Sequence, residues 1–71
     1  MKITYKKLWK LLIDKGLNKS DLKEKAGISS SSIAKLGHNQ NVNTDLLVKI
    51  CKALNCGLDE IMQLEEDNDK I

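Results

Sequence analysis

Apolar residues recur at helical spacing in five stretches of this chain, and residues that start or stop helices separate the stretches. The first stretch predicts a helix over residues 4–15, with Thr4 as its N-cap and Gly16 as a left-handed stop. The residues expected on its buried stripe are Tyr5, Leu8, Trp9 and Leu12. We therefore expect this helix to pack one face against the rest of the domain.

A short second helix is predicted over residues 19–26. Asn18 precedes it as an N-cap residue, and Asp21 stands at its third position, where a carboxylate stabilises the positive end of a helix. Gly27 ends the helix, because glycine adopts the left-handed conformation that a sharp turn requires. Its narrow apolar edge is formed by Leu22 and Ala26.

The third predicted helix follows the capping residue Ser29 and runs from Ser30 to Leu36 or Gly37, with Ile33 and Leu36 on its buried side. Serine is a poor helix former, costing roughly 0.5 kcal/mol relative to alanine, yet residues 30–32 are all serine. Their hydroxyls are therefore candidates for binding a ligand. A weakly selected surface is the alternative explanation.

Two more helices are predicted after a polar loop over residues 38–43, whose last residue, Asn43, is a capping residue. The first spans about residues 44–55, and Gly57 separates it from the second, over residues 58–64. The apolar positions of the pair are Leu47, Ile50, Cys51 and Leu54, followed by Leu58, Ile61 and Met62. Residues 65–71 are rich in acids and predict a frayed end.

These elements predict an all-α fold, a compact domain of five helices that covers residues 1–71 as a single unit. The composition agrees, because the 71 residues include no proline and only four glycines, with 41% apolar residues. A domain of this size has a thin core and little room for an active-site cleft. The spacings typical of catalytic, phosphate-binding and metal sites are missing. We expect no enzyme activity, no cofactor, no metal and no small-molecule substrate.

The longest apolar run is three residues long, and charges interrupt the first residues of the chain. We therefore expect no membrane span, no signal peptide and a cytoplasmic location. Cys51 and Cys56 are too few for a disulfide framework and are interpreted as small core side chains in a reducing compartment.

Positive charge is concentrated in the first half of the chain. Residues 1–35 carry nine lysines and three acids, for a net charge of +6, whereas residues 36–71 carry three lysines and seven acids, for −4. This asymmetry favours a basic face suited to an anionic partner, although lysines that only solvate helices would give the same pattern.

Residues 18–36 have the order helix, tight glycine turn, helix, which is typical of a helix-turn-helix. The strings KGLNKSDLKEKAGISSSSIAKL (residues 15–36) and NTDLLVKICKALNCGLDEIM (residues 43–62) resemble the Cro/C1-type (XRE) family of phage repressors and bacterial regulators. The resemblance covers roughly residues 8–64. It implies a lambda-repressor-like fold and a sequence-specific transcriptional regulator, repressor-like, with its recognition helix in the major groove of double-stranded DNA.

The same resemblance implies a set of DNA-contacting positions. Base edges are expected to be read by Ser30, Ser31 and Lys35. The DNA backbone is expected to contact Asn18, Lys19, Ser29, Ser32, His38, Asn39 and Asn41. Because serine binds several bases indifferently, discrimination per contact is expected at the low end of about 1–3 kcal/mol.

Besides the serines at its base-reading positions, the chain departs from the family at two positions. Lys23 replaces a small residue where the two motif helices pack closely, and its side chain is expected to extend outward. Gly37 replaces a longer polar side chain and is expected to leave the end of the recognition helix loose.

A homodimer, at least on DNA, is the expected assembly. It would use an exposed apolar strip around Trp9 and Ile13 or along residues 58–64. The alternative function is a protein-interaction module of the same fold, antitoxin-like or anti-repressor, with weak or no DNA binding. The serine-rich helix and the acidic tail are compatible with that alternative.

Overall fold

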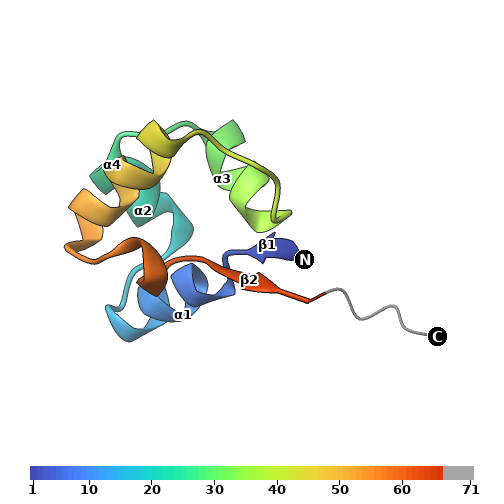
Figure 1. The fold of residues 1–71 in the computed structure, drawn as a ribbon. Coiled ribbons are helices and arrows are strands. Elements are labelled where there is room, and N and C mark those ends of the chain that lie inside the picture. Colours follow the sequence, from blue (N-terminus) through green and yellow to red (C-terminus); the bar gives the residue numbers. More distant parts are fainter. Residues whose placement is uncertain (67–71) are drawn as a thin grey trace.

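The computed structural model describes residues 1–66, and Figure 1 shows helices packed around a centre with a short two-stranded ribbon beside them. In chain order the elements are β1 (Lys2–Thr4), α1 (Lys6–Asp14), α2 (Lys19–Ala26), α3 (Ser30–Gly37), α4 (Thr44–Leu54), the 3₁₀-helix η1 (Leu58–Glu60) and β2 (Gln63–Glu65). The helices predicted over residues 19–26, 30–37 and 44–55 are confirmed to within one residue. None of the helices in residues 1–66 is both long enough and apolar enough to cross a membrane.

The prediction of an all-α fold with five helices is wrong at its last element. Residues 58–64 form η1 and then β2, so the described residues contain four α-helices. β2 pairs antiparallel with β1, with Ile3 opposite Leu64. The apolar residues of this stretch do not share one face, since Ile61 is fully buried whereas Leu58 is 51% exposed. In a continuous α-helix these two residues, three positions apart, would lie on the same face.

The ribbon also corrects the predicted start of α1 and, at Glu65 alone, the predicted frayed end. α1 begins at Lys6 because Thr4 belongs to β1, although the Thr4 hydroxyl still accepts a hydrogen bond from the Lys6 N–H at 3.3 Å. Glu65 lies in β2 and forms an ion pair with Lys6. Residues 67–71 of the acidic end lie outside the described part of the chain.

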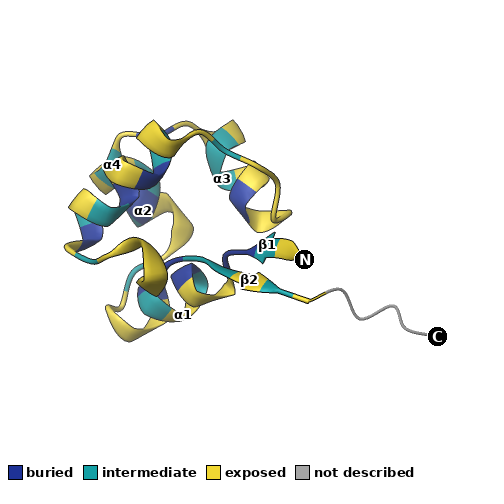
Figure 2. Ribbon diagram, in the orientation of Figure 1, coloured by how far each residue is buried: buried dark blue, intermediate teal, exposed yellow. Residues whose placement is uncertain are grey.

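One hydrophobic cluster draws on all four helices and on the segment after η1. Its members are Tyr5, Leu8, Leu12, Leu22, Ile28, Leu36, Leu47, Ile50, Leu54 and Ile61. Figure 2 shows these buried positions on the inner sides of the ribbons, with exposed positions facing outward. The cluster positions α3 because Leu36 from that helix and Ile28 from the preceding turn are both buried in it.

Candidate nucleic-acid interface

The α2–turn–α3 unit has the capping interactions that the sequence predicts. The Asn18 side chain accepts a hydrogen bond from the Asp21 N–H at 2.8 Å, and the Asp21 carboxylate accepts one from the Asn18 N–H at 3.0 Å. Gly27 then ends α2 with a φ of +67°. Such a positive φ is costly for residues with a Cβ, so the glycine permits the sharp turn between the helices.

Serine hydroxyls surround the first turn of α3. The Ser29 Oγ caps the helix by accepting a hydrogen bond from the Ser32 N–H at 3.2 Å. It also donates to the Ser32 Oγ at 3.1 Å and lies 3.0 Å from the Ser31 Oγ. The three residues expected to read bases, Ser30, Ser31 and Lys35, are all exposed. The tip of α3 is therefore an open, hydroxyl-rich surface.

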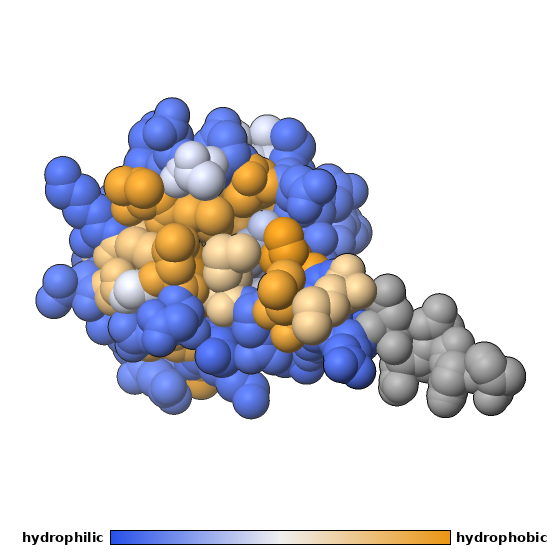
Figure 3. All heavy atoms as spheres, viewed as in Figure 1, coloured by the Kyte–Doolittle hydropathy of each residue, from blue (hydrophilic) through white to orange (hydrophobic). Residues whose placement is uncertain are grey.

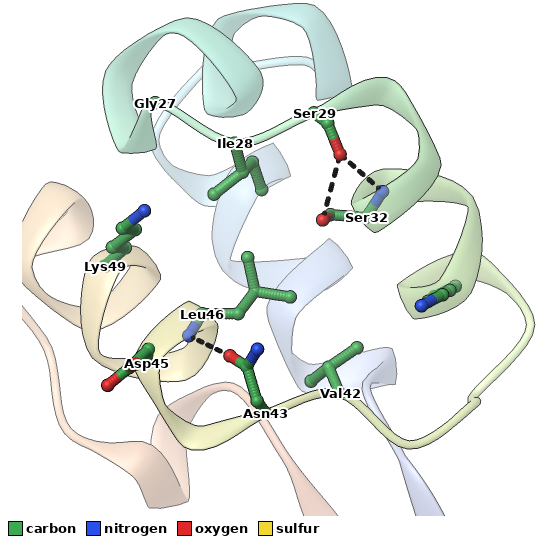
Figure 4. Close-up of a pocket in the computed structure, with 10 residues that line it drawn as sticks. Gly27, Ile28, Ser29, Ser32, Val42, Asn43, Asp45, Leu46 and Lys49 are labelled. Carbon is green, nitrogen blue, oxygen red and sulfur yellow. Dashed lines mark hydrogen bonds between the residues drawn. The ribbon is translucent and has the colours of Figure 1, made fainter.

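A groove of about 390 Å³ lies between the start of α3 and the start of α4. Figure 4 shows Ile28 and Leu46 pointing toward one another across it, and the Asn43 side chain capping α4 at the Leu46 N–H, a distance of 2.8 Å. Its polar lining consists of Ser29, Ser32, Lys35, Asn43, Asp45 and Lys49. The lining includes the N-termini of two helices, two lysines and one acid. Positive charge therefore predominates, and the groove favours anions. Three of these groove residues, Asn43, Asp45 and Lys49, were not among the site residues expected from the sequence.

Lys23 lies at the contact between the two motif helices. Its ammonium group donates a hydrogen bond to the Ser30 Oγ at 3.1 Å. The two side chains line a small hollow of about 130 Å³ together with Lys19, Ser20 and Ile33. The side chain reaches outward from the helix crossing, as expected, but it ends on a predicted base-reading residue. Sequence reasoning missed this contact, because it depends on how α2 and α3 cross.

Lys19, an expected backbone-contacting residue, lies over an aromatic ring. Its Nζ is 4.7 Å from the centre of the half-buried Trp9 ring, a distance typical of a cation–π interaction. Gly37 ends α3 close by, and a Cβ added there would lie 3.9 Å from the same Nζ. Trp9 packs against the core through the rest of its ring. The ammonium group of Lys19 is therefore held at the surface where α1, α2 and the end of α3 meet.

The loop after α3 has a structural role that the sequence does not indicate. Asn39 adopts a φ of +55°, and its side-chain oxygen accepts a hydrogen bond from the Tyr5 N–H at 3.0 Å. The Tyr5 hydroxyl donates to the Gln40 carbonyl at 3.0 Å. His38 and Asn41, the other expected contacts in this loop, are exposed.

The two cysteines lie away from this surface, where α4 ends. Both are half-buried against the core, which agrees with their interpretation as small packing side chains. Burial, reinforced by the neighbouring Cys51, raises the pKa of the Cys56 thiol to about 11. Among residues 1–66, no three side chains of the metal-binding types gather closely enough to hold an ion.

Comparison with known proteins supports the geometric interpretation. The sequence profile of the Cro/C1-type HTH DNA-binding domain matches residues 7–67. A crystal structure of the transcriptional regulator VanUg, in its form II, is similar to this chain with a TM-score of 0.85 and 47% sequence identity. The alignment covers 92% of this chain and 88% of the VanUg chain. The curated proteins contain no match to the chain.

Proposed function

Because the chain belongs to the Cro/C1-type HTH DNA-binding family, we propose that it is a transcriptional regulator that binds a specific double-stranded DNA sequence and represses by occupying it. The observation that carries the proposal is the open tip of α3, where Ser30, Ser31 and Lys35 are exposed. Leu36, near the other end of α3, is buried and anchors the helix in the core. Residues 1–71 act as a single domain in this proposal, located in the cytoplasm and working without a cofactor.

The roles of the site residues follow from their chemistry. Ser30 and Ser31 meet base edges in the major groove, and the Lys35 amine reaches the acceptor atoms of a guanine. The phosphate backbone meets the residues around this tip, namely Asn18, Lys19, Ser29, Ser32, His38, Asn39 and Asn41. We add Asn43 and Lys49 to the backbone set, because they line the same anion-favouring groove as Ser29, Ser32 and Lys35.

We further propose that two copies bind together on a palindromic site, with half-sites about 34 Å apart. Figure 3 shows apolar side chains gathered in the middle of one face, over α4 and the ribbon, with hydrophilic residues around them. Val48, Leu58 and Leu64 are 60%, 51% and 60% exposed. An apolar strip on the surface of a small protein is typical of an interface between subunits. Ile13, at 75% exposure, is the alternative contact beside Trp9.

Titration of fluorescent random-sequence DNA at several salt concentrations tests DNA binding. Each neutralised phosphate is expected to contribute about −0.9 to the slope of log affinity against log salt concentration. A selection of bound sequences from a random pool then tests specificity. Absence of binding at low salt would favour the protein-interaction module as the function of this fold.

A further inference from the structure

We propose that the two serine hydroxyls at the tip of α3 offer opposite hydrogen-bonding groups to DNA, with Ser30 donating and Ser31 accepting. Lys23 is the positioning residue that sets the orientation of the Ser30 hydroxyl. This inference rests on the proposed DNA-binding function and adds to it which atoms of the bases these serines recognise.

The orientation of the Ser30 hydroxyl follows from its contact with Lys23. An ammonium group has three donors and no acceptor, so in this 3.1 Å hydrogen bond the Ser30 Oγ must accept. The hydroxyl hydrogen is repelled by the positive charge and points away from Lys23. Ser30 is exposed, so it presents its O–H donor to a partner, and its one remaining lone pair lies beside the positive charge and is a poor acceptor for a second donor.

The orientation of the Ser31 hydroxyl follows from the bonds of Ser29. The single hydroxyl hydrogen of Ser29 is donated to the Ser32 Oγ at 3.1 Å. In its 3.0 Å contact with Ser31, Ser29 is therefore the acceptor and Ser31 the donor. The hydroxyl hydrogen of Ser31 points at the Ser29 Oγ, so the Ser31 oxygen presents only lone pairs to the outside. Ser31 is exposed and presents an acceptor to a partner.

The surroundings of Lys23 keep its ammonium group on Ser30. Lys23 is half-buried, and its side chain lines the small hollow together with Ser20 and Ile33. The neighbouring Lys19 ammonium lies over Trp9, and within residues 1–66 the side-chain hydrogen bond to the Ser30 hydroxyl comes from Lys23. A flexible exposed lysine would not hold the hydroxyl in this way.

Serine hydroxyls that are held in one orientation discriminate between bases, whereas freely rotating hydroxyls do not. A freely rotating hydroxyl donates or accepts as the base requires, whereas Ser30 here is matched to acceptor atoms. In the major groove those are N7 and O6 of guanine, N7 of adenine and O4 of thymine, whereas cytosine offers an N4 amino donor. Ser31 is matched to amino donors, which cytosine and adenine carry.

Binding measurements on Lys23→Met test the proposal, because methionine keeps an unbranched apolar side chain and removes the ammonium group. Lys25→Met is the matched control, since Lys25 is an exposed lysine of the same helix that lines a separate hollow with Leu17 and Leu54. Sequences selected by the wild type and by Ser30→Ala identify the base position at which Ser30 acts. Duplexes varied at that position, including 7-deazaadenine, which lacks the N7 acceptor and keeps the N6 amino donor, are then titrated.

We expect the wild type and Lys25→Met to bind duplexes with cytosine or 7-deazaadenine at this position about five-fold more weakly than duplexes with the selected base. Lys23→Met should reduce the difference to less than two-fold, and Lys23→Met with Ser30→Ala should behave as Ser30→Ala alone. Ser31→Ala should lose a preference for a base with an amino group at its own position. Thermal melting confirms that each variant is folded.

Two results would overturn the inference. In one, Lys23→Met keeps the full discrimination. In the other, it weakens binding to all duplexes equally and lowers the salt slope by about one, which would make Lys23 a phosphate contact. Failure of the wild type to bind any DNA at low salt is a distinct outcome, because it rejects the proposed function itself and the inference with it.

Discussion

The backbone N–H of Tyr5 donates a hydrogen bond to the side-chain oxygen of Asn39, across 34 positions of the chain and at 3.0 Å. The Tyr5 side chain is buried, and its hydroxyl donates to the carbonyl of the next loop residue, Gln40. These two bonds tie the loop after α3 to the start of α1. The position of the recognition helix relative to the core is therefore set at both of its ends.

Replacing Asn39 with glycine is expected to reduce the free energy of unfolding by about 1 kcal/mol, because the hydrogen bond from Tyr5 is lost. Asn55→Gly is the matched control. Asn55 has the same φ of +55° at the end of α4, so its replacement tests the relief of backbone strain alone and should be neutral or slightly stabilising. Urea denaturation measures both values. Equal effects of the two substitutions would show that the contact with Tyr5 contributes no stability.

Gly27→Ala is expected to reduce stability by about 1–2 kcal/mol, and Gly27→Val by more, because both residues resist a positive φ. The cost is conformational, since no atom lies within 4 Å of a Cβ built at this position. Gly37→Ala is the control. A Cβ there makes only an ordinary contact, and alanine favours the helix by about 0.5–1 kcal/mol, so stability should rise. Thermal melting that shows an unchanged midpoint for Gly27→Val would contradict the left-handed turn.

Lys35→Ala and Lys19→Ala are expected to affect DNA binding differently. Loss of Lys35 should narrow the difference in affinity between selected and random duplexes, by up to about 1–3 kcal/mol, because a base contact is removed. Loss of Lys19 should weaken binding to both duplexes alike and reduce the salt slope by about one. Titrations of the two duplexes at three salt concentrations separate these effects. The assigned roles are wrong if the two variants behave identically.

Cys56 is expected to react slowly with alkylating reagents in the folded protein. Its pKa of about 11, against an ordinary value of 9.0, lowers the thiolate fraction at neutral pH by about 100-fold. The higher nucleophilicity of a more basic thiolate offsets part of this, so the rate should fall by about ten-fold relative to the unfolded chain. Trypsin cleavage after Lys52 places the two cysteines on separate peptides for mass spectrometry.

Ionisation of the Cys56 thiol should make the folded protein less stable as the pH rises. Folding raises the pKa of Cys56 because burial disfavours the thiolate. Its contribution to stability is therefore complete below pH 9 and is lost as the pH rises through about 11. Cys56→Ala should flatten this part of the stability profile. A reaction rate for Cys56 equal to that of the unfolded chain would contradict the raised pKa.

Local features of the fold could be predicted from the sequence, because their determinants lie within a few residues of one another. Asn18, Ser29 and Asn43 cap the helices that they precede, and each acts on an N–H three positions later. The exposure of Ser30 and Ser31 followed from the buried stripe on the opposite side of α3.

The features that the sequence did not indicate depend on residues far apart in the chain. β1 and β2 have three residues each, too few for an alternating pattern, and their partners lie about sixty positions apart. The contact of Lys23 with Ser30 depends on the crossing of two helices. The hydrogen bond that Asn39 accepts depends on the positive φ of this residue, a conformation that residues other than glycine rarely adopt.

The ribbon joins the first and last described segments of the chain, which affects the order in which the domain folds and the place where it first unfolds. The loop that it closes is the longest in the fold, so its closure costs the most chain entropy, and it should form after the helices have docked. Short strands at the edge of a domain are also the first to separate in brief local openings. Amide protons of β1 and β2 should therefore exchange with heavy water sooner than those of α4.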